Sequence, residues 1–417
     1  MSTGYTLEGF ENIQYQGLKH LQTLQGRLST LYKSYGYHQV MTPTLESYDL
    51  YSDEEGFRRE DLFKLVNHQG KVLVLKHDAT VPITRTAAIN HRDRKEIIKF
   101  FYHTNLYRNF SSPDIIKKEE SQMGIEYFGS HSPECDGEII ELALQSLKVN
   151  GIQDIHVDIG HVGFINHFFD TLSLSKKTRL ELFRLIENKN LADIHDFIAP
   201  LSLTKKSKKI LMALPMLYGD PKDIVSEMSE LCVNEDMEAV VDYLKALLHH
   251  TDTVGITPYL YFDLGFTNRM NYYSDLIFKA YMDDWGETVI GGGRYNHLSA
   301  QFGIDRPACG FGIDLLGTLD YLDQKGLLEK EAVSTTVILY HRDEKARAHQ
   351  YATELRSKGK SAEMFDLYTT PKAFIHSQKN NILYENARFI YLKDGVFHHY
   401  QNGALVPEKE NPSCKSN

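Results

Sequence analysis

The 417-residue sequence predicts an α+β protein, with an antiparallel sheet flanked by helices, a helical insertion and a small C-terminal α/β domain. Two aromatic and β-branched runs, residues 97–108 and 122–128, flank a polar loop and predict a pair of antiparallel strands. Residues from about 164 to 250 instead show helical periodicity, which indicates an insertion between strands. After residue 334, short strands alternate with helices, a pattern typical of an α/β domain.

The first third of the chain supplies the elements that lead into these strands. Leucines at helical spacing from Leu21 onward predict an amphipathic helix that ends before Gly36. Residues 37–42 predict a strand that ends at Pro43, because proline cannot donate to a strand ladder. The next predicted elements are a hairpin of residues 62–66 and 71–75, and a helix capped by Asp78 or Thr80 with Pro82 in its first turn.

The remaining core elements follow similar local signals. Ser132 and Pro133 match the N-cap and first position of a helix. The later predicted elements are strands at 155–159, 259–264 and 271–281 and a helix at 315–322. We therefore expect a core over residues 1–325 with its insertion at about 164–250, an α/β domain over 334–405, and a disordered tail over 406–417.

Composition excludes several classes of protein. A net charge of −10 argues against a broad nucleic-acid interface. The four cysteines fit neither a zinc site nor a disulfide framework, as expected for reduced thiols in a cytoplasmic protein. The N-terminus lacks a signal-peptide pattern, and no apolar run approaches the roughly 20 residues of a membrane span. Common catalytic motifs are missing, so we expect no catalytic residues, no metal and no cofactor.

Polar residues on the two long predicted strands form a candidate site. Gln122 and Glu126 are four residues apart, so they share one face of their strand, and Arg108 ends the partner strand. Asp78 begins the helix that precedes them. Buried charges are costly unless they are paired or bound to a ligand. Two interpretations stay open, an ion pair on the sheet surface or a pocket for a small zwitterion.

A glycine-rich stretch, Gly291 to Tyr295, is the second candidate. Three consecutive glycines allow positive φ or a close approach of the backbone to a ligand. Taken alone, such a stretch is more often a hairpin turn. Together with Tyr272 and Tyr273 upstream, it fits the floor of an amino-acid pocket.

The order of these segments resembles the class II aminoacyl-tRNA synthetase core, and the residues resemble histidyl-tRNA synthetase and its non-synthetase relatives over about residues 10–323. The matching segments are 35–46, Arg108 with 122–126, 268–273, 291–295 and 310–314. The C-terminal domain loosely resembles the synthetases' anticodon-binding domain. The histidine pocket that the resemblance implies consists of Asp78, Thr80, Arg108, Gln122, Glu126, Tyr272, Tyr273, Gly291, Gly292 and Arg294.

The resemblance also implies a role for each part of this pocket. Asp78 and Gln122 would meet the ammonium group of histidine. Glu126 and Tyr273 would meet its imidazole ring. Arg108 would face the carboxylate or phosphate side.

Departures from the synthetase pattern are concentrated where ATP is activated. Leu316-Gly317-Thr318 stands where the synthetases have Glu-Arg-Leu, and glycine cannot supply the positive charge that stabilises a pentavalent phosphorus. Phe110 replaces an acidic residue, and Asn268 replaces the arginine that holds the histidine carboxylate. The Leu-Arg-Pro-Glu segment becomes residues 75–78. These losses argue against a working synthetase.

The same losses resemble the regulatory subunits of ATP phosphoribosyltransferase. That resemblance implies a non-catalytic partner of a short-form catalytic subunit, acting in the first step of histidine biosynthesis and in feedback by histidine. It also implies a homodimer within a hetero-oligomer, with the stripe from Leu21 to Tyr35 as core or as dimer interface. The effector histidine would bind the remnant pocket or the interface between subunits. Two alternatives remain: a divergent histidyl-tRNA synthetase, and a module sensing an amino acid or tRNA, although the acidic balance disfavours tRNA.

Overall fold

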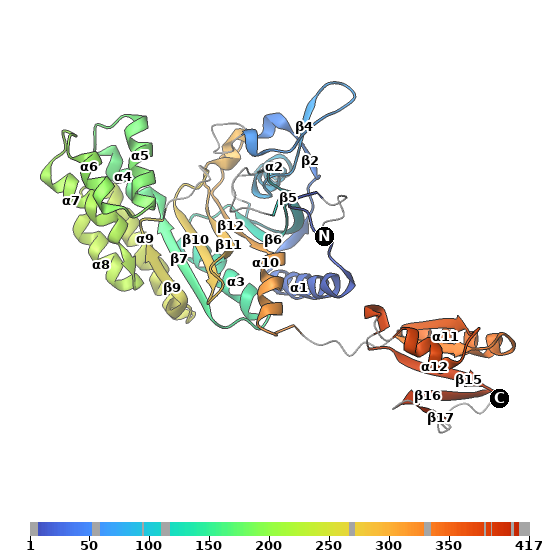
Figure 1. Ribbon diagram of the computed structural model, residues 1–417. Helices are drawn as coiled ribbons and strands as arrows, with labels where there is room; N and C mark the ends of the chain where they lie inside the picture. Colours follow the sequence, from blue (N-terminus) through green and yellow to red (C-terminus); the bar gives the residue numbers. More distant parts are fainter. Residues whose placement is uncertain are drawn as a thin grey trace. The chain divides into compact units, whose positions relative to one another are not determined.

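A computed structural model describes residues 7–51, 59–93, 96–109, 117–266, 272–328, 335–378, 381–384, 386–401 and 404–407 (Figure 1). The chain divides into two compact units, residues 1–327 and 328–417. Each unit has its own sheet and its own hydrophobic core.

The first unit is built on a nine-stranded sheet with the order β1-β5-β6-β12-β11-β10-β7-β9-β8. Its strands are β1 (His38–Val40), β5 (Ile98–Tyr107), β6 (Glu119–Phe128), β7 (Ile155–His161), β8 (Tyr218–Gly219), β9 (Leu260–Asp263), β10 (Leu276–Met282), β11 (Thr288–Arg294) and β12 (Ala308–Asp314). The predicted antiparallel pairing of β5 with β6 is confirmed. The sheet is mixed, because β1 pairs with β5 and β7 with β9 in parallel.

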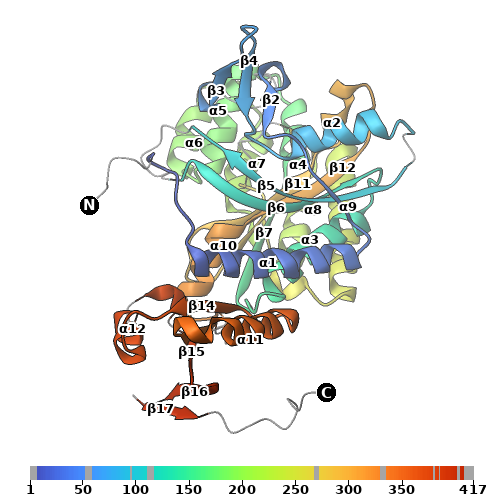
Figure 2. The same ribbon diagram turned by 90° about the vertical axis from the view of Figure 1, so that its right-hand side faces the viewer.

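One face of this sheet is covered by helices α1 (Tyr15–Ser34), α3 (Pro133–Lys148) and α10 (Leu315–Gln324) (Figure 2). Tyr32 of α1 packs on Phe101 and Phe311 with ring centroids 5.8 and 6.2 Å apart. The apolar stripe of α1 is buried within its own chain at Leu21, Leu24, Leu28 and Tyr32. These four positions of the stripe are therefore core.

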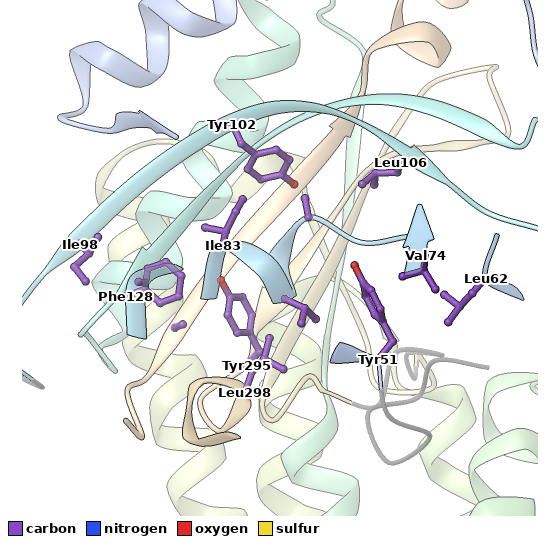
Figure 3. Packing of buried hydrophobic residues seen from close by; sticks show 14 residues of the cluster. Tyr51, Leu62, Val74, Ile83, Ile98, Tyr102, Leu106, Phe128, Tyr295 and Leu298 are labelled. Carbon is purple, nitrogen blue, oxygen red and sulfur yellow. The ribbon is translucent and has the colours of Figure 1, made fainter. Parts of the chain in front are cut away.

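The opposite face is covered by α2 (Thr80–Asn90), which packs with β5 and the end of β6 on the cluster drawn in Figure 3. The side chains in this cluster include Ile83, Tyr102, Phe128 and Tyr295. A small sheet adjoins it, with the order β2 (Leu45–Ser47), β4 (Val72–Leu75) and β3 (Lys64–Val66), and the predicted hairpin is its antiparallel β3–β4 pair. Asp78 accepts a hydrogen bond from the backbone N–H of Val81 at 2.9 Å, as predicted for a cap of α2.

Six helices lie between β7 and β9 and gather on one side of the sheet (Figure 1). They are α4 (Val162–Asp170), α5 (Lys176–Glu187), α6 (Leu191–Ile198), α7 (Lys205–Ala213), α8 (Pro221–Leu231) and α9 (Glu235–Thr253). Five begin with a side-chain cap, supplied by Ser175, Asn190, Thr204, Asp220 and Asn234. The long connection lets β9 return parallel to β7, and it adds the edge strand β8, which the sequence pattern did not indicate.

The described part of the second unit has a five-stranded sheet and two α-helices. The order is β14 (Ala362–Asp366), β13 (Thr336–Tyr340), β15 (Arg388–Lys393), β16 (Val396–Gln401) and β17 (Ala404–Pro407), with α11 (Lys345–Ser357) and α12 (Pro371–Ser377). The whole of β13 is buried, as expected for a central strand with parallel neighbours. Val406 and Pro407 belong to β17, so the predicted tail begins too early; residues 408–417 lie outside the described chain.

The described ranges contain no helix with the length and apolar character needed to cross a membrane. Within the same ranges, no three histidine, cysteine or acidic side chains are grouped so as to hold a metal ion.

Candidate functional site

Alternate residues of β6 point toward α2, and they carry the polar side chains of a candidate site. Gln122 and Glu126 share this face, as predicted, and β12 lies beside them with Gly310 and Gly312. A Cβ atom on Gly310 would lie 2.1 Å from Oε2 of Glu126, and one on Gly312 would lie 2.5 Å from Cδ of Gln122. The glycines of β12 therefore leave the space that these two long side chains occupy.

Glu126 is almost completely buried, at 1% exposure, and both of its oxygens accept hydrogen bonds. Thr80 Oγ1 donates to Oε1 at 2.7 Å, and the Tyr295 hydroxyl donates to Oε2. The Tyr272 hydroxyl donates to Oδ2 of Asp78 at 3.4 Å. These residues bring two buried carboxyl groups to the tyrosines on the α2 side of the sheet.

Three tyrosine rings pack together beside Glu126. The ring centroids of Tyr272 and Tyr273 are 4.7 Å apart, and those of Tyr272 and Tyr295 are 5.9 Å apart. Tyr273 and Tyr295 are separated by 6.5 Å. Ring faces and a carboxyl group together suit a flat ligand that carries N–H donors or a positive charge, such as an imidazole.

The other end of the site is a chain of polar contacts along β5 and β6. Arg108, directly after β5, pairs with Oε2 of Glu120, and Nε2 of Gln122 donates to Oε1 of the same carboxylate at 2.9 Å. The Tyr102 hydroxyl donates to Oε1 of Gln122 at 2.7 Å. Arg108 thus pairs with Glu120 at this end, while Glu126 is held by hydroxyl donors at the other. We call the whole set the Glu126 site; its members are Asp78, Thr80, Tyr102, Arg108, Glu120, Gln122, Glu126, Tyr272, Tyr273 and Tyr295.

Glu120 and Tyr102 are members that the sequence reasoning missed, whereas Tyr295 ends the glycine-rich stretch that was predicted as the pocket floor. Glu120 was assigned to the loop before β6, but the strand begins at Glu119. The available signal was the two-residue period of a strand. Glu120, Gln122, Gly124 and Glu126 are each two residues apart, so they share one face of β6. The same parity relates Tyr102 on β5 to Arg108, which directly follows that strand.

Gly292 and Arg294 are not brought to this site, which corrects their assignment. Both point to the α3 face of the sheet, because they alternate along β11 with Gly291 and Gly293. Arg294 is fully buried there and binds Asp136 of α3 through Nε at 3.1 Å and NH2 at 2.8 Å.

The three glycines form the middle of β11 and make no hairpin turn. None of them has a positive φ. Gly291 alone is open, since a Cβ atom on it would meet nothing within 4 Å. On Gly293 a Cβ atom would lie 2.5 Å from the carbonyl oxygen of Leu276 and 2.8 Å from the ring of Tyr273. Close packing, and not backbone conformation, explains why glycine occupies position 293.

Comparison with known proteins shows the family. Residues 9–317 match the family model described as histidyl-tRNA synthetase. A protein of Oceanobacillus iheyensis named ATP phosphoribosyltransferase regulatory subunit is 35% identical over 300 residues, 71% of each chain. A protein of Alkaliphilus metalliredigens with the same name is 30% identical over 90% of this chain and 95% of its own. The chain belongs to the ATP phosphoribosyltransferase regulatory subunit family.

Solved structures agree with this membership and confirm the predicted fold class. An ATP phosphoribosyltransferase regulatory subunit/histidyl-tRNA synthetase from Bacillus halodurans C has a TM-score of 0.82 and 26% identity, covering 94% of this chain and 98% of that one. Histidyl-tRNA synthetase from Nostoc sp. PCC 7120 has a TM-score of 0.76 and 17% identity, covering 98% and 97%. The regulatory-subunit family therefore shares its fold with the synthetase.

In this member of the regulatory subunit family, burial controls the protonation of the site. Burial raises the pKa of Glu126 to about 8, against the hydrogen bonds from Tyr295 and Thr80. It raises the pKa of Asp78 as well, and lowers the pKa of His77 to about 4, where the charge of Arg108 adds to the effect. Without a ligand, Glu126 therefore holds a proton at neutral pH for much of the time.

Replacing Glu126 by glutamine should change how stability depends on pH. Between the unfolded pKa of about 4.5 and the folded pKa of about 8, the native state holds a proton that the unfolded state has lost, so stability falls as pH rises. In the Glu126→Gln variant this side chain does not titrate, so it causes no fall in the free energy of unfolding as pH rises. From pH 4.5 to pH 8 its free energy of unfolding should gain about 2–4 kcal/mol relative to wild type, measured by urea denaturation.

The matched control is Glu181→Gln in α5. The hydrogen bond from Arg184 lowers the pKa of Glu181, so the pH-dependent difference should have the opposite sign and be small. An equal difference between wild type and Glu126→Gln at both pH values would contradict the raised pKa.

Proposed function

We propose that this chain is a non-catalytic subunit that assembles with a separate, short-form catalytic subunit of ATP phosphoribosyltransferase in the cytoplasm. In this role it would support the first step of histidine biosynthesis and carry feedback by histidine. The observation that carries the proposal is that relatives aligned over most of their length share the name of regulatory subunit.

The absence of synthetase activity is part of the proposal. Gly317 lies in the first turn of α10, where the synthetase pattern would place an arginine, and it offers no charge to a phosphate. Arg108 is paired with Glu120, and Lys117 donates to Asp320 at 2.8 Å. Two of the other departures, Phe110 and Asn268, lie outside the described residues. An active adenylating enzyme needs free cations at this point.

We further propose histidine as the ligand of the Glu126 site. Its imidazole ring would lie against the three tyrosines, with an N–H directed at the buried carboxyl group of Glu126. Ionised Glu126 would pair with an imidazolium ring, which offsets the cost of its burial. Feedback would then be a coupling free energy of about 1–3 kcal/mol between this site and the catalytic subunit.

Co-purification tests assembly. A tagged full-length chain, expressed with the short-form catalytic subunit of the same organism, should bring that subunit through affinity and size-exclusion columns. The complex should show ATP phosphoribosyltransferase activity that histidine inhibits. Absence of a complex would overturn the assignment, and histidine-dependent ATP–pyrophosphate exchange by the isolated chain would show a synthetase instead.

Calorimetry with histidine tests the location of the ligand. Glu126→Gln should weaken histidine binding to the isolated chain at least about tenfold, because the ring loses its charged acceptor. Tyr261→Phe on β9, far along the same sheet, is the control and should bind as wild type does. Inhibition of the complex that survives Glu126→Gln unchanged would place the effector at the interface between subunits.

A further inference from the structure

The guanidinium group of the Glu126 site already holds an anion. Glu120 contacts NH1 of Arg108 with Oε2, and its Oε1 accepts from Gln122 at 2.9 Å, so both of its oxygens are engaged. The two side chains are only 20% and 22% exposed. A phosphate that approached Arg108 would have to displace a carboxylate that is fixed from two sides.

The second feature that could bind an anion is the N-terminus of α10, a helix of ten residues. Oδ1 of Asp314 accepts from the backbone N–H of Leu316 at 3.0 Å, so the chain's own carboxylate takes this position. A Cβ atom on Gly317 would lie 2.7 Å from Oδ2 of Asp314. Glycine at 317 therefore gives Asp314 the room to cap the helix.

These two carboxylates belong to the same site. Asp314 is paired with Gln122 in the β12–β6 register, and Gln122 binds Glu120. Burial raises the pKa of Asp314 to about 6, and the negative charge of Glu120 is the second cause of this shift. The charges of the two carboxylates therefore interact. Asp78 and Glu126 add two further acidic groups along the same face, while Arg108 and Lys117 supply positive charge there and are paired with Glu120 and Asp320.

We propose that Glu120 and Asp314 are built-in anions that close the Arg108 end of the site to phosphate, so that the site accepts a cationic or zwitterionic ligand and rejects nucleotides. The proposal rests on the Glu126 site being a ligand site, and it adds the two residues that set its selectivity. The glycine at 317 and the two carboxylates have the same effect on phosphate. A positively charged side chain introduced at 317 would pair with Asp314, and a phosphate would still be repelled by Glu120.

Titration with inorganic pyrophosphate and with ATP tests this, using calorimetry on the isolated full-length chain. The double variant Glu120→Gln with Asp314→Asn keeps side-chain shape and removes both charges. It should bind pyrophosphate at least about tenfold more tightly than wild type. Adding Arg108→Gln should abolish the gain, because the freed guanidinium is the group that takes the phosphate.

The matched control is Glu119→Gln, which removes the same charge one residue away. Glu119 points to the opposite face of β6, where it accepts from Asn105 at 2.8 Å, so pyrophosphate binding should not change. Circular dichroism checks folding. If the double variant does not fold, the single variants Glu120→Gln and Asp314→Asn are titrated instead. Each should bind pyrophosphate more tightly than wild type, by a smaller factor than the double variant.

Two outcomes would overturn the proposal. One is wild type that binds pyrophosphate or ATP as tightly as the double variant does. The other is a gain that persists when Arg108 is replaced, since the phosphate would then bind elsewhere. These titrations contain neither histidine nor a catalytic subunit. Failure here is therefore separate from failure to form the complex or to bind histidine.

Discussion

Arg294→Met should lower the free energy of unfolding of the first unit by about 3–5 kcal/mol. Arg294 and Asp136 are 0% and 1% exposed, and three nitrogen–oxygen contacts of 2.8–3.1 Å join them. Methionine fills the volume of the arginine stem but leaves the Asp136 carboxylate buried, with the Tyr243 hydroxyl at 2.6 Å as its remaining side-chain donor. Fluorescence of Trp285, the single tryptophan of the chain, during urea denaturation reports on this unit.

The control is Arg184→Met in α5, where the partner Glu181 and the arginine are 38% and 57% exposed. Water already solvates that pair, so stability should change by less than about 0.5 kcal/mol. Adding Asp136→Asn to Arg294→Met should recover part of the loss, because it removes the unpaired charge. A loss below about 1 kcal/mol for Arg294→Met would show that the buried pair contributes little.

Local patterns were enough to predict the elements near which the site is built. The stripe of α1, the cap at Ser132 and the β3–β4 hairpin depend on residues close together in the sequence, and the structure contains all three. The order of the sheet depends on distant pairings. β6 lies between β5 and β12, which are separated by some two hundred residues, and no local pattern encodes that neighbour or the parallel β7–β9 pair.

The site shows the same division. Gln122 and Glu126 share a face because strand side chains alternate, which the sequence alone predicted. Arg294 was misplaced because the glycines were taken as a pocket floor, whereas alternation along β11 sends position 294 to the α3 face. Its partner Asp136 lies 158 residues earlier, so nothing near Arg294 indicates the ion pair. Tyr272 and Tyr273 were expected in a strand, but β10 begins at Leu276 and leaves both rings before it.

Gly293→Ala should destabilise the first unit by about 3 kcal/mol or more, whereas Gly291→Ala should be tolerated within about 1 kcal/mol. Both glycines lie on the same strand and face the Glu126 site, two residues apart. At 293 the new methyl group would lie 2.5 Å from the carbonyl oxygen of Leu276, and backbone cannot move there without breaking the β10–β11 pairing. At 291 the methyl group enters open space.

Glycine is expected at 293 because of close packing and at 291 because the backbone there is open, and two measurements distinguish these reasons. Urea denaturation followed by Trp285 fluorescence should detect the packing defect at 293 and nothing comparable at 291. Calorimetry with histidine on the stable Gly291→Ala variant then asks whether the ligand uses the open backbone at 291. Equal losses of stability at both positions would contradict the packing explanation, because only one of the two methyl groups has a neighbour to strike.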